Sequence, residues 1–163
     1  MQTRVERFAQ DLLERFPEDT VAQFNYLPTV RAQLALDRNH PSDAIADLQA
    51  AAPYEWGLNF GGLYIAYVRG QAYLALHQGN EAATEFQKIL DHRGAVINQP
   101  IGALAHLGLG RAYALEAAAQ RDQSPSLRGK ALTAYQHFLT LWKDADPDVP
   151  VLKEARTEYA KLQ

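Results

Sequence analysis

The five histidines of this 163-residue chain are the side chains best suited to acid–base or metal chemistry at neutral pH. Two histidines four residues apart would share a helix face and could ligate one metal ion. No pair here has that spacing, so a metal site would require two histidines and a carboxylate to meet through folding. We therefore expect no metal site, and histidines in turns and on helix surfaces, at His40, His77, His92, His106 and His137.

Three alternating aspartates, Asp144, Asp146 and Asp148, have the spacing of the first ligands in a calcium-binding loop. Such a loop ends with a bidentate Glu at its twelfth position, where this chain has Ala155. Short acidic side chains beside prolines also form turns and cap helices. The run therefore predicts a rigid turn before a final helix.

Residues for covalent or cofactor chemistry do not stand in the settings that such chemistry needs. The chain has no cysteine, and Ser124 and Ser126 lie in a polar segment without a nearby His–Asp pair. Gly108 and Gly110 lack the third glycine of a dinucleotide-binding loop and lie within a helical pattern. We expect no catalytic centre and no bound cofactor, so the chain is not predicted to be an enzyme.

Arg31 and Arg69 occupy equivalent positions, each just before a small residue on a face that leans toward the interior. An arginine in that setting needs a carboxylate or carbonyl partner. Two interpretations remain open: a structural ion pair that fixes helix geometry, or two arginines that bind an anion. We favour the structural interpretation, because charges in such environments often serve structure alone.

Composition narrows the possible partners. The chain is 47% hydrophobic and 21% charged, as is ordinary for a soluble globular protein. Its net charge of −3 gives no basic surface for nucleic acid, and no apolar run is long enough to insert into a membrane. The amphipathic start at 1–16 contains acidic residues, which argues against a signal peptide.

Apolar residues recur with the helical period along most of the chain, and no strand-like window competes, so we predict an all-α fold. Asp19 or Thr20 can cap the second helix, which Pro28 should either kink or begin, and Ser42 can cap the third. The predicted helices cover 2–16, 20–38, 43–52, 62–90 as an antiparallel pair, 100 to beyond 115, 130–142 and 151–162.

The helix pair at 62–90 sets the pattern for the chain. Gly70 and Tyr73 on its first helix are followed, after a polar break, by Ala82 and Phe86 on its second. The small residues let the two backbones approach where the helices cross, and the rings of Tyr73 and Phe86 fill the space beside them. One such hairpin cannot bury its own apolar face, so it predicts neighbours of the same kind.

The same small residues recur in two neighbouring hairpins, at intervals of 38 and then 40 positions on the first helices. They are Ala32, Gly70 and Gly110 on the first helices, and Ala44, Ala82 and Ala131 on the second helices. The third hairpin carries about nine extra residues around 117–129. Ser, Pro and Gly in that insertion predict an extended tip.

The Gly–Tyr and Ala–Phe pairs resemble the tetratricopeptide repeat (TPR) pattern. That resemblance implies a right-handed α-solenoid of three TPR-like helical hairpins in one domain over 1–163. The implied parts are a flanking N-terminal helix at 1–17, repeats at 18–53, 61–92 and 100–143, and a C-terminal capping helix at 148–163.

Several phrases resemble a more specific family, among them YVRGQAYLAL (67–76), GALAHLGLGRAYAL (102–115) and FLTLWKDADPDVPVLKEA (138–155). They are similar to the C-terminal TPR segment of bacterial, acidobacterial-type, eukaryote-like serine/threonine protein kinases, and to the tail of some winged-helix regulators. The resemblance implies a regulatory or sensor segment of a longer protein, with kinase activity in a domain absent from this chain. It leaves both the cytoplasm and the periplasmic side of a membrane-anchored kinase open as locations.

In a TPR array the first helices of the hairpins line a concave groove that takes a protein or peptide partner. Projected from the glycine positions, that face is expected to carry Tyr26, Thr29, Gln33, Tyr64, Tyr67, Val68, Gln71, Leu104, Leu107 and Arg111. Alternatively, about half of these tyrosines pack against the next repeat. Two other functions stay open: self-association through the first helix and 151–162, and sensing of a small ligand in the groove or at 53–60.

Overall fold

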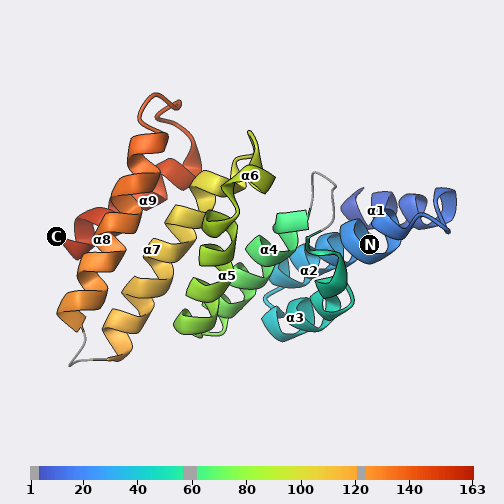
Figure 1. The fold of residues 1–163 in the computed structure, drawn as a ribbon, viewed down its shortest axis with the longest axis horizontal. Coiled ribbons are helices and arrows are strands. Elements are labelled where there is room, and N and C mark those ends of the chain that lie inside the picture. Colours follow the sequence, from blue (N-terminus) through green and yellow to red (C-terminus); the bar gives the residue numbers. More distant parts are fainter. Residues whose placement is uncertain (1–3, 57–61, 121–123) are drawn as a thin grey trace.

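The computed structural model describes residues 4–56, 62–120 and 124–163 (Figure 1). Every regular element within these ranges is a helix, which confirms the all-α prediction. The elements are α1 (Arg4–Arg15), the π-helix η1 (Ala22–Tyr26), α2 (Leu27–Asp37), α3 (Pro41–Gln49), the 3₁₀-helix η2 (Ala52–Tyr54), α4 (Gly62–Ala75), α5 (Gly79–Asp91), α6 (Arg93–Val96), α7 (Ile101–Ala119), α8 (Ser124–Leu141) and α9 (Pro150–Leu162).

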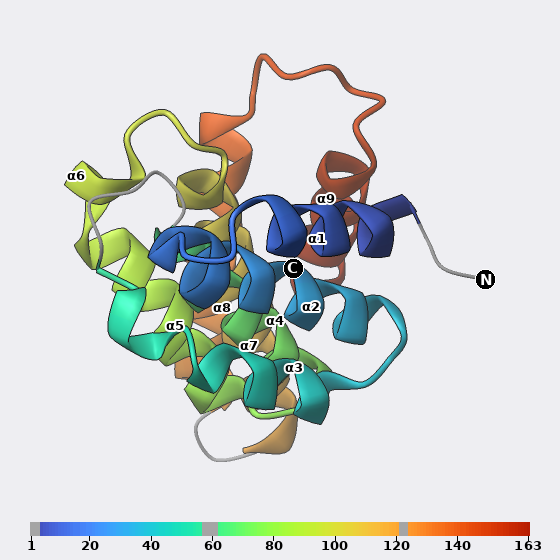
Figure 2. The same ribbon diagram turned by 90° about the vertical axis from the view of Figure 1, so that its right-hand side faces the viewer.

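The helices follow one another along the longest axis of the molecule, from α1 at one end to α8 and α9 at the other (Figure 1). Helices α2 and α3, α4 and α5, and α7 and α8 pack as consecutive pairs, and α3 contacts α4 as α5 contacts α7. Figure 2 views the molecule from the end that holds α1, with α2 and α3 close behind it. Each helix thus packs mainly on its neighbours in sequence.

The α-helix α2 begins at Leu27 with Pro28 in its first turn, within one residue of the predicted start, and the π-helix η1 precedes it. The backbone N–H of Leu27 donates to the carbonyl of Ala22, five residues earlier, which is a π-helical bond. Because Pro28 has no N–H, an α-helical ladder would leave one carbonyl without its usual donor here. The π-turn places this irregularity before the proline, and the Thr29 hydroxyl donates to the Asn25 carbonyl at 2.7 Å.

Two helix starts differ in their caps. Asp19 caps the second helix as expected, because its Oδ1 accepts from the Ala22 N–H at 2.9 Å. Ser42, in contrast, is not a cap: α3 already begins at Pro41, and His40 stands at the N-cap without a side-chain bond. Proline at the first helical position, where no N–H is needed, starts this helix one residue earlier than predicted.

Most of the described residues of the insertion at 117–129 are helical, whereas an extended tip was predicted. Helix α7 continues to Ala119, and α8 already begins at Ser124; residues 121–123 lie outside the described ranges. Alanine is the strongest helix former, and Pro125 sits in the first turn of α8, where its missing N–H costs nothing. The extra residues therefore lengthen both helices of the pair.

Aromatic rings against glycines hold the pairs together. The ring of Phe86 on α5 lies against Gly70 of α4 and Gly108 of α7, and the ring of Tyr135 on α8 lies against Gly110 of α7. Phe86 and Tyr135 are both buried. The predicted contact between small and large residues is confirmed for Gly70 and Phe86, and Gly108 extends it to the next helix pair. Among the described residues, no helix is both long and apolar enough to cross a bilayer.

Candidate functional site

Four of the predicted groove residues gather where α4 meets α7. Tyr64, Tyr67 and Gln71 are half-buried on α4, and Gln71 Nε2 donates to the Tyr67 hydroxyl at 3.0 Å. Burial raises the pKa of Tyr67, while Arg111 of α7 acts to lower it and Tyr64 to raise it further, so both groups lie close to Tyr67. The structure thus brings together Tyr64, Tyr67, Gln71 and Arg111, here called the tyrosine face.

The tyrosines of this face also take part in packing. The Tyr67 ring meets Phe86 edge to face, with centroids 5.9 Å apart, and Tyr64 packs on the same core cluster. One side of each ring is therefore committed to the fold. The half that stays exposed offers aromatic surface and a hydroxyl group to a ligand.

The three predicted residues on the second helix, Tyr26, Thr29 and Gln33, do not contact one another through their polar groups. Tyr26 is exposed, Thr29 bonds within its own helix, and Gln33 Nε2 donates to Asp37 Oδ1 at 3.0 Å. These local bonds use the polar groups of Thr29 and Gln33. Of the three predicted residues, Tyr26 thus has the most exposed surface.

Val68 and Leu107 do not line a groove, contrary to the expectation for them. Val68 is 4% exposed in the cluster between α4 and the α2–α3 pair, and Leu107 is 2% exposed in the cluster with α8 and α9. Leu104 is partly buried beside Leu107. The reason is helical phase: one residue past Tyr67 the side chain has turned by about 100°, away from the tyrosine face and into the core.

Arg111 is held by α9. Its Nε and Nη2 donate to the two carboxylate oxygens of Glu158, both at 2.9 Å, and Nη2 also reaches Glu154 at 3.2 Å. The Tyr135 hydroxyl donates to the same Glu158 at 2.9 Å. Burial and this carboxylate raise the pKa of Tyr135 above its usual value. Arg111 is thus a bridge from the tyrosine face to the last helix.

Arg69 has a structural ion-pair network, as favoured from the sequence. Its Nη2 contacts Glu55 Oε2 at 2.8 Å and Glu85 Oε2 at 2.6 Å, and Lys88 Nζ lies 3.0 Å from both carboxylates. Glu55 follows η2, so the network ties that segment to α4 and α5. Burial acts to lower the pKa of Arg69, but the two carboxylates outweigh it and raise that pKa.

Arg31 lies elsewhere, in a cavity of about 330 Å³ between α1, α2 and α3. Burial raises the pKa of Asp47 there, and Arg31 acts in the opposite direction. The two arginines are therefore in different environments, and the structure does not place them as a pair around one anion.

Two histidines that are distant in the sequence, His106 and His137, are in contact in the fold. The rings of His106 on α7 and His137 on α8 lie 5.2 Å apart, edge to face. Burial lowers the pKa of His106, and His137 and Arg93 lower it further. Because the helix pairing creates this contact, no fixed spacing in the sequence could have revealed it. Within the described ranges, no three His, Cys, Asp or Glu side chains are grouped as metal ligands would be.

The histidine pair lines a cavity of about 550 Å³ over α5, α7 and α8, here called the histidine cavity. Apolar Leu90, Leu109 and Ala134 line this cavity, together with two exposed cations on its rim, Arg93 and Lys130, and one exposed carboxylate, Asp91. The Lys130 ammonium lies 5.6 Å from the centre of the Tyr113 ring. Among the described residues, neither rim cation has a carboxylate within ion-pair distance.

The aromatic segment at 53–60 is described only in part, since 57–60 lie outside the described ranges. Tyr54 stacks on Phe24 with centroids 5.3 Å apart, and Trp56 packs on His92 at 4.2 Å. These rings attach the segment to its neighbours.

The chain matched no family model, no curated protein and no solved structure.

Proposed function

We propose that this chain is a non-catalytic protein-binding module, built as a right-handed stack of TPR-like helical hairpins. Support comes from three consecutive helix pairs and from rings that pack on glycines at their crossings, at Gly70 with Phe86 and at Gly110 with Tyr135. The sequence resemblance to the C-terminal segment of bacterial serine/threonine kinases gives the proposed context. In that context the module recruits partners to a kinase, or regulates it.

The tyrosine face is the observation that carries this proposal. Tyrosines are favoured at protein interfaces because they offer a large, rigid surface and a hydrogen bond at low entropic cost. Tyr64 and Tyr67 are fixed by packing on one side and half-exposed on the other, so their rings are already in place before a partner arrives. Extended or helical peptides are the ligands that such a face suits.

A peptide library displayed on phage and selected on the wild-type chain tests this proposal. Affinities of the selected peptides are then measured by fluorescence anisotropy against a Tyr64→Ala/Gln71→Ala variant and against Tyr67→Phe, which keeps the ring on Phe86. We expect the double variant to bind at least about tenfold more weakly, since two interface contacts are removed.

Gln49→Ala, an exposed change on α3, is the matched control and should bind as the wild type does. Circular dichroism confirms that each variant keeps its helices. Peptides that bind the double variant and the wild type equally would show that the tyrosine face is not the site.

The histidine cavity supports a second candidate function, the sensing of a small anionic ligand. Its volume of about 550 Å³ lies within the range of small-molecule sites. An apolar lining with two cations, Arg93 and Lys130, against one carboxylate, Asp91, complements an apolar body that carries a carboxylate or phosphate group.

Thermal-shift measurements with a panel of aromatic carboxylates and phosphate monoesters test this second function. Stabilisation by a panel member should disappear in an Arg93→Gln/Lys130→Gln variant and persist in Lys143→Gln, which changes an exposed cation outside the cavity. If no panel member stabilises the chain, or if stabilisation survives the double change, the cavity is not a site for such anions.

A further inference from the structure

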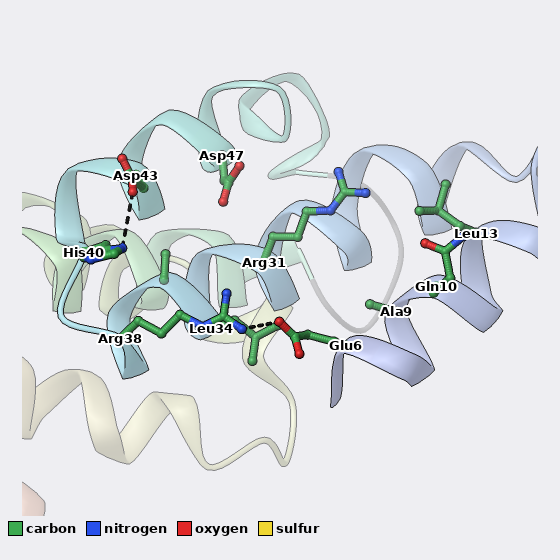
Figure 3. A pocket seen from close by; sticks show the side chains of 11 residues that line it. Glu6, Ala9, Gln10, Leu13, Arg31, Leu34, Arg38, His40, Asp43 and Asp47 are labelled. Atoms are coloured by element: carbon green, nitrogen blue, oxygen red, sulfur yellow. Dashed lines mark hydrogen bonds and ion pairs between the residues drawn. The ribbon is translucent and has the colours of Figure 1, made fainter. Parts of the chain in front are cut away.

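The contact between His106 and His137 brings together two imidazole rings whose nitrogens have no hydrogen-bond partner among the described residues. The cavity between α1, α2 and α3 shows a different arrangement. There, His40 Nδ1 lies 3.6 Å from Asp43 Oδ2 (Figure 3). A histidine beside a carboxylate already has a counterion when it takes up a proton, whereas the pair in the histidine cavity has none within ion-pair distance in the described structure.

His106 lies where two cavities meet. It lines the histidine cavity and also a second cavity of about 670 Å³ over α5, α6, α7 and the end of α8. Leu90, Arg93 and His106 line both of them. His106 is half-buried, but its ring nitrogens are not among the sealed polar atoms without a partner, so they reach solvent. A ligand in either cavity can therefore contact this imidazole.

The charged groups around the histidine pair carry an excess of positive charge. The ionisable residues that line the two cavities, among the described residues, are Asp91 of α5, Arg93 of α6, His106 and Tyr113 of α7, and Lys130 and His137 of α8. Asp91 already accepts from Gln87 Nε2 at 2.7 Å within its own helix. Two permanent cations against one carboxylate favour an anion, and disfavour a metal cation, beside the two imidazoles.

Protonation of His106 is unfavourable while the site holds no anion. Burial lowers the pKa of His106, and His137 and Arg93 lower it further. An anion bound beside the imidazole supplies the missing negative charge, so it raises that pKa. A ligand that raises a pKa binds more tightly as the pH falls, because proton uptake and ligand binding then favour each other.

We propose that the His106–His137 pair binds the anionic group of a small ligand, and that His106 takes up a proton from solvent as the ligand binds. A neutral imidazole donates from one nitrogen and a protonated one from both. Because the ring centroids are only 5.2 Å apart, the oxygens of one carboxylate, phosphate or sulfonate group can accept from both rings. The apolar body of the ligand then lies against Leu90 and Leu109.

This proposal rests on the anion-sensing function given above as the second candidate, and it adds the regulation of that site. Binding is strengthened by acid and weakened as the pH rises, so the chain responds to the ligand and to pH together.

Isothermal titration calorimetry with 2-naphthalenesulfonate on the full chain tests the proposal. A sulfonate stays ionised across the range used, so a change in affinity with pH does not come from the probe. We expect the affinity to be at least about tenfold higher at about pH 6 than at about pH 8. Repeating the titration in buffers of different ionisation enthalpy should show a net uptake of up to about one proton per ligand bound.

His106→Gln keeps a polar side chain but cannot take up the proton, so both the rise in affinity at low pH and the proton uptake should disappear. His77→Asn, in an exposed turn outside both cavities, is the matched control and should keep both effects. Circular dichroism checks that each variant keeps its helices. In the wild type, an NMR titration of the histidine ring protons should show that the probe raises the pKa of His106.

The outcomes separate this proposal from the sensing function on which it rests. Equal affinity at both pH values, or a pH dependence that survives His106→Gln, would overturn the proton-linked site and leave anion sensing intact. A probe that binds the wild type at neither pH would overturn both.

Discussion

The ring of Phe86 lies directly against the backbone of Gly108. A Cβ atom built on Gly108 would stand 2.5 Å from Cε1 and Cζ of that ring, closer than carbon atoms approach in folded proteins. Gly70 lies against the same edge of the ring, where a Cβ would be 2.8 Å from Cε1 and from Cζ. One aromatic side chain of α5 thus sets the separation of α5 from both α4 and α7.

Replacing Gly108 with alanine should therefore destabilise the fold. The buried Phe86 ring has no room to move, so the added methyl group acts as overpacking and should lower the free energy of unfolding by about 1–3 kcal/mol. Urea unfolding followed by circular dichroism measures this. Gly129→Ala on α8 is the control: a Cβ there meets nothing within 4 Å, so the change should be neutral or stabilising. Equal losses for both variants would contradict the role given to Phe86.

Removing the positive charge of Arg69 should destabilise the fold, because the buried carboxylates of Glu55 and Glu85 then lose one of their cationic partners. Glu55 is 5% exposed and Glu85 9% exposed, and only Lys88 would remain to pair with them. We expect Arg69→Met to lower the free energy of unfolding by about 3 kcal/mol.

The Arg69 prediction has an internal check. Adding Glu55→Gln and Glu85→Gln to Arg69→Met removes the uncompensated charges and should recover part of the lost stability. Chemical denaturation of the single and combined variants gives the coupling. No recovery in the triple variant would mean that Arg69 acts through packing of its aliphatic stem instead.

Glu158 should hold α9 more strongly than Glu154 does, although both contact Arg111. Glu158 accepts two bonds from the guanidinium and one from Tyr135, whereas Glu154 has one contact at 3.2 Å and is 61% exposed. Glu158→Gln should cost about 1–2 kcal/mol and Glu154→Gln below about 0.5 kcal/mol. The hydrogen-exchange rates of the α9 amides measure this difference. An equal increase of these rates in both variants would contradict the prediction.

The free energy of unfolding should decrease as the pH is lowered, because of His106. Its pKa is lowered in the folded chain by burial, by His137 and by Arg93, so the unfolded chain binds more protons as the pH drops below the ordinary histidine value of about 6.5. The contribution is complete above that pH and is lost as pH falls through the folded pKa.

Thermal unfolding between about pH 8 and pH 5 measures this effect against the ordinary histidine pKa. His106→Gln should flatten the pH dependence. His77→Asn, in an exposed turn with a φ of 58° that asparagine tolerates, should leave the pH dependence as it is. A slope unchanged by His106→Gln would place the titrating group elsewhere.

Local patterns predicted the helices and several of their contacts. The helical period of apolar residues was sufficient for the all-α fold, and the small residue Gly70 with Phe86 was sufficient for one crossing. The start of α8 at Ser124, within the insertion at 117–129, was not predicted, because turn-forming residues there also begin a helix when proline stands in its first turn. Val68 and Leu107 were misplaced because a helical projection from glycines is uncertain by one position, which is a rotation of about 100°.

The sequence by itself determined where the chain is helical, because helix formation depends on interactions within about one helical turn. It also determined that Gly70 and Phe86 pack where two helices cross, because these two helices follow each other in the chain. Only the tertiary structure decided which distant groups meet: His106 with His137, Arg69 with two glutamates, and Arg111 with Glu158. It also decided that Val5 and Phe8 of α1 stay exposed. These relationships depend on how helices rotate against one another, and that rotation is set by the packing of the whole chain.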